Sequence, residues 1–353
     1  MAVTPPAPRL TARTRLPALL GLGALAGGAF ISEGAPAKDA PASDAPASDT
    51  LAIEPDEVRE LWPGGPPGPV PEGLVEHLVE RDNPFGLCDR AAHNVTRPSL
   101  SVFRPARPHG GAILIIPGGG YAWVVVDKEG YEGARHFAAQ GYTVYVLRYR
   151  LPHQGWQAGR LAPLQDAQRA IRMIRAQAAR DGIRPDAVLV MGFSAGGHLA
   201  GSLGARAGLR LHEPVDAVDA QPARPDALAL LYPVVTMERP FAHPRSRDNR
   251  LGPDPSEADV RAASLEQTVQ PGHPPTLLIH AADDRSVTVD HALLLFQALR
   301  AGTVPAALHV FERGGHGFGL RGIAGTPLEA WPRLVIDWAQ THGLPKASGA
   351  DRL

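Results

Sequence analysis

The stretch that decides the fold is Met191-Gly192-Phe193-Ser194-Ala195-Gly196-Gly197-His198. It follows an apolar run at residues 187–191 and leads into small residues at 198–203, a pattern that predicts a strand, a tight turn and a helix. Glycine is needed at positions 192 and 196, because a side chain there would collide with the neighbouring strand or helix. Such a turn lifts Ser194 clear of the sheet. Because a serine hydroxyl alone is a weak nucleophile, the chain must also supply a base and an orienting acid.

Strand patterns alternate with helical patterns along the rest of the chain. We predict strands at residues 99–103, 111–116, 142–150, 227–231, 275–280 and 307–311, and helices at 131–140, 166–180, 290–301 and 328–342. This alternation predicts an α/β fold with a mostly parallel, doubly wound sheet flanked by helices. Residues 234–274 are rich in Pro, Arg, His and Asp, and so long a segment between core elements is typical of a functional loop or a cap.

Candidate acid and base residues follow two of the predicted strands. Asp283 and Asp284 come after the strand at 275–280, and His316 lies in the glycine-rich loop 314–319 after the strand at 307–311. Since the carboxyl ends of parallel strands meet at one edge of a sheet, we expect His316 and one carboxylate to reach Ser194. Asp284 is the predicted acid and Asp283 the alternative, because only one of them can face His316. The chain order Ser, Asp, His is that of the α/β-hydrolase fold.

A triple-glycine loop at residues 118–120 follows the strand at 111–116. Its backbone N–H groups have no side chains in the way, so with the N–H of Ala195 they could stabilise a developing oxyanion. Tyr121 beside this loop is a candidate for lining the substrate pocket, with simple core packing as the alternative. His198 is predicted to be a packed histidine and not a second base. No metal-ligand spacing is present, and the single cysteine, Cys88, is expected to be a buried, inert thiol.

Composition describes an ordinary globular protein with an unusual amino-terminal region. The net charge is −1 and no basic stripe is present, so nucleic acid is not an expected partner. Residues 1–37 are predicted to be a signal peptide, because three arginines precede an apolar stretch at 16–31 and small residues at 35–37 offer a cleavage site. We therefore expect export to the periplasm or beyond, with no membrane span after cleavage. An Ala/Pro/Ser/Asp-rich linker (38–60), a catalytic domain (61–345) and a flexible tail (346–353) are expected to follow.

Several motifs together resemble bacterial α/β-hydrolases of the acetyl-xylan-esterase-like type, whose relatives include feruloyl-esterase-like enzymes. The resemblance runs from about Trp62 to Trp338 and rests on residues 117–121, 127–130, 149–152, 162–170, 192–198 and 314–319. It implies an exported serine esterase that removes acetyl or related acyl groups from plant polysaccharides and uses no metal or organic cofactor. The site residues that it implies are Ser194, Asp284 and His316 as the triad, with Gly119, Gly120 and Ala195 as oxyanion donors.

The resulting hypothesis is a serine carboxylic-ester hydrolase that acts through an acyl-enzyme on acetylated polysaccharide or acetylated sugars. Two alternatives stay open: a peptidase of the oligopeptidase-like hydrolase class, and a non-catalytic secreted carbohydrate-binding protein on an esterase scaffold. Residues 287–291 read Val-Thr-Val-Asp-His, where the resembled family usually has Val-Pro-Val-Glu-Asn. That loop borders the expected site, so the acyl and sugar preferences stay open, as does the oligomeric state.

Overall fold

A computed structural model describes residues 52–345 of the 353-residue chain. The predicted signal peptide, the first part of the predicted linker and the predicted tail lie outside the described residues. Between residues 52 and 345, no helix is both long enough and apolar enough to cross a membrane.

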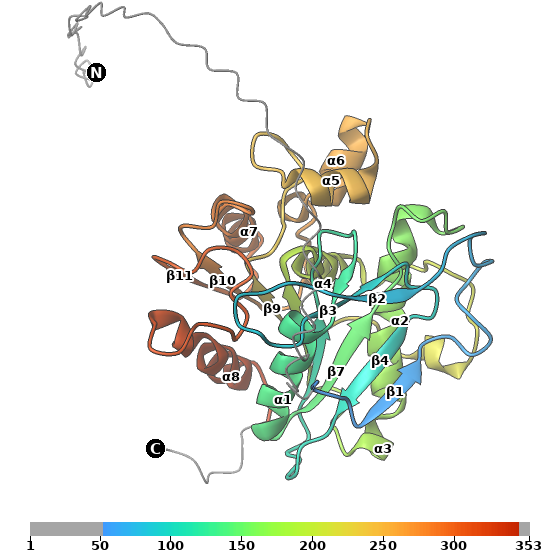
Figure 1. Cartoon of the computed structure of the whole chain (residues 1–353), viewed down its shortest axis with the longest axis horizontal. Helices are drawn as coiled ribbons and strands as arrows, with labels where there is room; N and C mark the ends of the chain where they lie inside the picture. The colour runs from blue at the N-terminus through green and yellow to red at the C-terminus, as the bar shows by residue number, and fades with distance from the viewer. Residues whose placement is uncertain (1–51, 346–353) are drawn as a thin grey trace, which may run out of the picture. The chain divides into compact units, whose positions relative to one another are not determined.

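The core of the fold is an eight-stranded sheet with the strand order β1-β4-β7-β5-β8-β9-β10-β11 (Figure 1). The strands from β7 to β11 in this order run parallel to one another, whereas β4 is antiparallel to both of its neighbours, β1 and β7. This confirms the predicted mostly parallel sheet. The strands are β1 (Glu57–Glu60), β4 (Ser99–Phe103), β5 (Ala112–Ile116), β7 (Thr143–Arg148), β8 (Val188–Phe193), β9 (Ala227–Leu231), β10 (Thr276–Ala281) and β11 (Ala306–Phe311).

Helices cover both faces of the sheet, as a doubly wound fold requires. Alternate residues of the central strands point into two separate apolar clusters: Leu114 and Val190 join one, whereas Ile113 and Leu189 join the other. The first cluster includes residues of α2, α4 and α7, and the second includes residues of α1 and α8. The helices are α1 (Glu132–Ala139), α2 (Ala162–Ala176), α3 (Ala178–Asp181), α4 (Ser194–Arg206), α5 (Pro244–Leu251), α6 (Glu257–Ala263), α7 (Asp290–Ala301) and α8 (Trp331–Thr341).

Short helical turns complete the chain, and one of them explains a shifted boundary. The helix predicted to start at residue 166 begins at Ala162, because Pro163 fits the first turn, where its missing N–H costs no hydrogen bond. The start of the helix predicted at 328–342 is instead a short turn before α8. The turns are η1 (Asp127–Tyr131), η2 (Gly159–Leu161), η3 (Ala217–Ala220), η4 (Leu265–Gln267) and η5 (Pro327–Ala330).

Two features of the sheets depart from the prediction. The last residues of the predicted linker form β1, which pairs with β4, so the prediction of a linker up to residue 60 is wrong at this end. Arg59 of β1 is buried and forms an ion pair with Asp181 at 2.6 Å. Its partner is distant in the sequence, so no local pattern could have predicted this contact. A second, three-stranded sheet was also not predicted; it contains β2 (His77–Glu80), β3 (Arg90–His93) and β6 (Val124–Val125).

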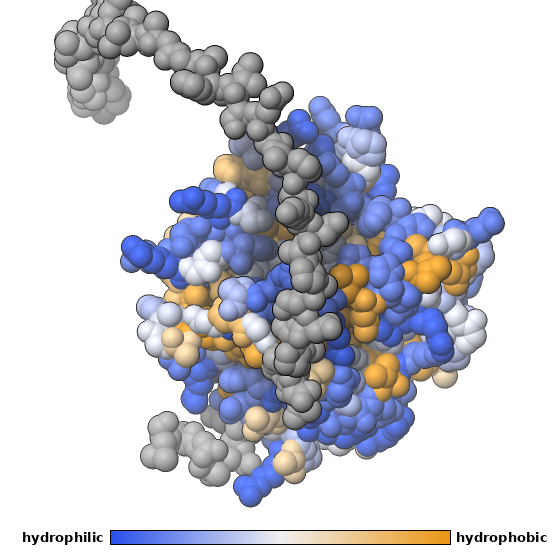
Figure 2. All heavy atoms as spheres, in the orientation of Figure 1, coloured by the Kyte–Doolittle hydropathy of each residue, from blue (hydrophilic) through white to orange (hydrophobic). Residues whose placement is uncertain are grey.

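The long segment at residues 234–274 folds into α5, α6 and η4 (Figure 1). It contacts the triple-glycine loop, because Asn249 Nδ2 donates a hydrogen bond to the carbonyl oxygen of Gly120 at 2.9 Å. On the face drawn in Figure 2, hydrophobic residues form small groups within a mostly hydrophilic surface. Four of the exposed large hydrophobic residues lie close together in the sequence, on β2 and in the loop after it: Leu78, Val79, Phe85 and Leu87.

Candidate active site

Ser194 stands at a sharp turn between β8 and α4. Phe193 is extended, with φ −113° and ψ 132°, whereas Ser194 has a positive φ of 51°, a strained conformation for a residue with a side chain. An added Cβ at Gly196 would lie 2.1 Å from the carbonyl oxygen of Ile116, and one at Gly192 would lie 2.5 Å from the carbonyl oxygen of Gly196. Both positions therefore require glycine, as the sequence predicted. The close packing allows the helix to start directly at the end of the strand.

The structure brings Ser194, His316 and Asp284 into one hydrogen-bonded row. Ser194 Oγ lies 2.9 Å from His316 Nε2, and His316 Nδ1 lies 2.7 Å from Asp284 Oδ2. A carboxylate oxygen only accepts, so His316 Nδ1 carries the proton that it donates to Asp284. In the neutral ring, Nε2 is then free to accept the proton of the Ser194 hydroxyl. This arrangement can take a proton from Ser194 as that oxygen attacks an electrophile.

Asp284 is buried and keeps its negative charge. Its Oδ1 accepts hydrogen bonds from the backbone N–H groups of Ser286 and Val287, both at 2.9 Å. Burial by itself would raise the pKa of Asp284, but the imidazoles of His280 and His316 outweigh it and hold that pKa well below its usual range. The carboxyl group therefore stays ionised and can stabilise a positive charge on His316.

Asp283, the alternative acid, faces a different group. Its Oδ1 accepts a hydrogen bond from the backbone N–H of Gly315 at 2.8 Å, next to His316 in the chain. The structure thus brings Asp284 to the imidazole and uses Asp283 to hold the loop that carries the imidazole. Sequence reasoning left both open, because two adjacent aspartates after a strand differ only in the direction in which each side chain points.

The triple-glycine loop lies directly beside Ser194. An added Cβ at Gly118 would be 2.9 Å from Ser194 Cβ. The N–H of Gly118 donates to Glu129 Oε2 at 2.8 Å, whereas within residues 52–345 the N–H groups of Gly119 and Gly120 have no hydrogen-bond partner. Ala195 follows Ser194 in the first turn of α4, where a helical N–H has no partner within the helix. These amides can therefore donate to an oxyanion that forms on Ser194.

Glu129 and Tyr232 also support the site. Glu129 lies in the motif at residues 127–130 that contributes to the family resemblance, but this role was predicted for neither residue from the sequence. The Tyr232 hydroxyl donates to Glu129 Oε1 at 3.2 Å, while the other oxygen of Glu129 holds the triple-glycine loop. The ring of Tyr232 also packs edge-on against His316, with the centroids 5.1 Å apart. The two residues thus connect the loop with free amides to the imidazole, a link that only the folded chain creates.

Tyr121, predicted as a candidate substrate-binding residue, is packed inside the protein. It is only 1% exposed, and its hydroxyl lies 2.8 Å from His198 Nδ1. His198 Nε2 lies 2.7 Å from the carbonyl oxygen of Ala263, so Nε2 must donate and Nδ1 must accept from Tyr121. The structure corrects the interpretation of Tyr121 as part of the pocket wall, because the phenol is committed to this buried pair. His198 is the packed histidine that the sequence predicted.

The buried His198 makes a testable contribution to stability at low pH. Burial, aided by the charge of Arg250, lowers the pKa of His198 from 6.5 to about 3, so the folded state binds this proton less readily than the unfolded state. Its contribution to the free energy of unfolding is therefore present above pH 6.5 and is lost as the pH falls towards 3. Between pH 6.5 and 5 we expect His198 to account for a loss of about 2 kcal/mol.

Urea unfolding of the wild type and of His198→Gln at these two pH values measures this contribution. Glutamine does not titrate, so the variant is expected to lose less stability on acidification than the wild type. An equal loss in both proteins would contradict the assignment to His198.

The structure shows no site that could hold a metal ion within residues 52–345, since they contain no group of three or more suitable side chains. The sequence predicted a buried Cys88, whereas in the structure this residue is only half-buried. Burial and the nearby Asp127 raise the pKa of its thiol to about 11, so the sulfur stays protonated and weakly reactive.

Comparisons with known proteins place this site in a wider context. The sequence model of the BD-FAE family matches residues 100–299. The solved structure of an acetyl ester-xyloside bifunctional hydrolase from Caldicellulosiruptor lactoaceticus superposes with a TM-score of 0.67 at 31% identity, covering 84% of this chain and 99% of that one. A carboxylesterase from Lactobacillus plantarum, at 23% identity and a TM-score of 0.57, shares the fold.

Two curated relatives are longer proteins. An acetylxylan esterase from Xylanibacter ruminicola is 31% identical over 257 residues, which are 71% of this chain and 49% of the relative. Endo-1,4-beta-xylanase B from Butyrivibrio fibrisolvens is 35% identical over 205 residues, which are 58% of this chain and 32% of that protein. The chain thus spans about half or less of the length of these two relatives.

Proposed function

The chain belongs to the BD-FAE family and has the α/β-hydrolase fold of esterases, and from this premise we propose that it is a serine carboxylic-ester hydrolase. One observation carries the proposal: the row of Ser194, His316 and Asp284 lies beside a loop with free backbone amides. A nucleophile, a base, an oriented acid and oxyanion donors are the four parts that acyl transfer requires.

The proposed reaction has two halves. Ser194 Oγ attacks the ester carbonyl carbon while its proton passes to His316 Nε2, and the amides of Gly119, Gly120 and Ala195 stabilise the oxyanion. The bond to the alcohol then breaks as His316 gives the proton to the departing oxygen, which leaves the acyl group on Ser194. In the second half, His316 takes a proton from water, the resulting nucleophile attacks the acyl carbon, and the acid leaves as Ser194 regains its proton.

The proposed substrates are acetylated plant polysaccharide and acetylated sugars. Support comes from the similarity to proteins described as an acetylxylan esterase and as an acetyl ester-xyloside hydrolase. The geometry supports ester hydrolysis in general, and the similarity supports this choice of alcohol and acyl group.

An acetate-release assay across acetylated xylan, acetylated monosaccharides and aryl acetates tests the proposal. We expect release of acetate from the sugar esters and covalent labelling of Ser194 by a fluorophosphonate probe. Faster cleavage of an aminoacyl-anilide than of any acetate ester would favour a peptidase. Glycan binding without labelling by the probe would favour a non-catalytic carbohydrate-binding protein.

A further inference from the structure

A cavity of about 580 Å³ lies beside His316, a residue of the loop that follows β11. Apolar and polar side chains line it in equal numbers, and a cavity of this size is large enough for a small molecule. His316 belongs both to the hydrogen-bonded row with Ser194 and to the wall of this cavity. The other wall residues that matter here are Phe85, Phe311, Phe318, Ile323 and Lys128.

The chemistry of the proposed reaction decides which part of an ester would reach this cavity. The carbonyl oxygen must face the free amides of the triple-glycine loop. The leaving oxygen must lie next to His316 Nε2, because that nitrogen returns the proton to it. The group attached to the leaving oxygen therefore starts beside His316, whose side chain also lines the cavity. The acyl group is attached to the other side of the carbonyl carbon and extends elsewhere.

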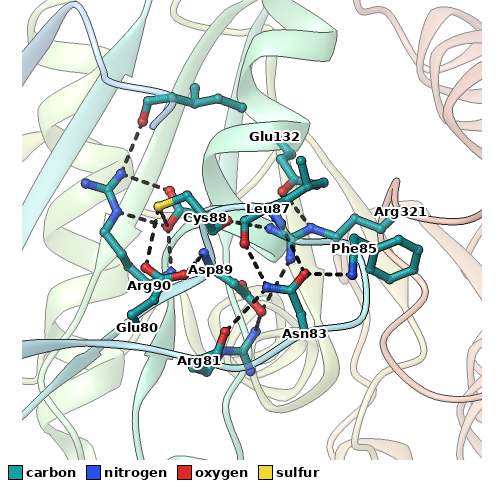
Figure 3. A network of polar contacts seen from close by, with 12 residues as sticks. Glu80, Arg81, Asn83, Phe85, Leu87, Cys88, Asp89, Arg90, Glu132 and Arg321 are labelled. Carbon is teal, nitrogen blue, oxygen red and sulfur yellow. Dashed lines mark hydrogen bonds and ion pairs between the residues drawn. The ribbon is translucent and has the colours of Figure 1, made fainter. Parts of the chain in front are cut away.

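Phe85 reaches the cavity from the loop between β2 and β3, and 48% of it is exposed. Asn83 shapes this loop, because its Oδ1 accepts hydrogen bonds from the backbone N–H groups of Phe85 at 3.1 Å and Leu87 at 3.4 Å. Arg321, from the other side of the cavity, donates to the carbonyl oxygen of Cys88 at 2.7 Å (Figure 3). The loop that carries Phe85 is therefore shaped by Asn83 from within and tied by Arg321 to the segment after His316.

Arg321 is itself buried and is held by carboxylates from two other segments of the chain. Its guanidinium donates to Glu132 Oε1 at 2.8 Å and lies 3.5 Å from Asp89 (Figure 3). Asp89 in turn forms an ion pair with Arg81 at 2.7 Å, in the same loop as Phe85. This network links the loop that carries Phe85 to the segment after His316 through a chain of ion pairs.

Lys128 contributes a positive charge to the same wall, and this charge has no partner among the described residues. An added Cβ at Gly317 would lie 3.7 Å from its Nζ, which puts the ammonium next to the loop of His316. Among the residues that the structure describes, this ammonium has no hydrogen-bond or ion-pair partner. An ammonium can donate three hydrogen bonds. The wall thus combines an aromatic surface with a free ammonium group.

We propose that this cavity binds the sugar ring on the alcohol side of the ester, with the ring of Phe85 against an apolar face of the pyranose and Lys128 donating to its oxygens. The proposal rests on the proposed function, because it needs an ester bond held between Ser194 and His316. A pyranose carries C–H groups on its faces, which match the aromatic part of the wall. The hydroxyl groups around its rim match the ammonium of Lys128. A purely aromatic alcohol would offer the ammonium of Lys128 no hydrogen-bond acceptor.

Two acetate esters that differ only in the alcohol test this proposal: an acetylated methyl pyranoside and methyl acetate. Phe85→Ala is expected to lower kcat/KM for the pyranoside about tenfold, and to change that for methyl acetate by less than about twofold, because only the sugar reaches the cavity. Phe85→Tyr keeps the ring and is expected to retain wild-type activity. Lys128→Met is expected to lower kcat/KM about threefold for the pyranoside alone.

Leu87→Ala is the matched control, since Leu87 lies in the same loop and is 40% exposed but does not line the cavity. It should leave both esters unaffected. An equal loss with both esters in Phe85→Ala, or no loss with the pyranoside, would overturn the assignment of the cavity while ester hydrolysis stands. A larger loss with phenyl acetate than with the pyranoside would assign the cavity to an aromatic alcohol instead. Failure of the wild type to cleave any of these esters would contradict the proposed function itself.

Discussion

Replacing Ser194 with alanine is expected to lower kcat for ester hydrolysis by a factor on the order of 10⁴ to 10⁶. The change removes the only atom that would bond to the acyl group, whereas His316, Asp284 and the free amides remain. Any residual rate would come from the oxyanion donors and from substrate binding. Hydrolysis of p-nitrophenyl acetate by the purified variant measures this effect over the required range.

Ser202→Ala is the matched control for this substitution. Ser202 is a buried serine in the same helix α4, so its loss tests what removing a buried hydroxyl does to the fold. We expect wild-type activity in Ser202→Ala and unfolding midpoints close to that of the wild type in both variants. Turnover by Ser194→Ala within about tenfold of the wild type would end the acyl-enzyme proposal.

Asp284→Asn is expected to lower kcat on the order of 10⁴-fold. The carboxylate holds the proton of His316 on Nδ1, which leaves Nε2 free to accept from Ser194. An amide can donate to Nδ1, and this would favour the other tautomer, in which Nε2 carries the proton and cannot act as a base. The amide also has no charge with which to stabilise the imidazolium. Steady-state kinetics with an aryl acetate measure the loss.

Asp283→Asn gives the matched comparison, because it makes the same chemical change one residue away. The amide oxygen of asparagine can still accept the hydrogen bond from the backbone N–H of Gly315. We therefore expect kcat to change by only about threefold or less. Equal losses in the two variants, or a larger loss in Asp283→Asn, would contradict the assignment of Asp284 as the partner of His316.

Much of the fold could be predicted because its signals are local. The strand at 227–231 and the helix at 290–301 have the predicted limits, since continuous apolar runs and a 3.6-residue period report burial directly. By contrast, β1 has the sequence Glu-Val-Arg-Glu, which shows no apolar run, and its pairing with β4 and the buried ion pair of Arg59 depend on distant residues.

The sequence by itself determined which chemical groups follow which strands, and therefore that a serine, a histidine and an aspartate gather at one edge of the sheet. Only the tertiary structure decided between Asp283 and Asp284, moved Tyr121 from the pocket wall into the packed interior, and joined Glu129 to the loop beside Ser194. The physical reason is that the succession of strands and helices follows from local patterns along the chain, whereas the direction of a single side chain depends on neighbours that only folding brings into contact.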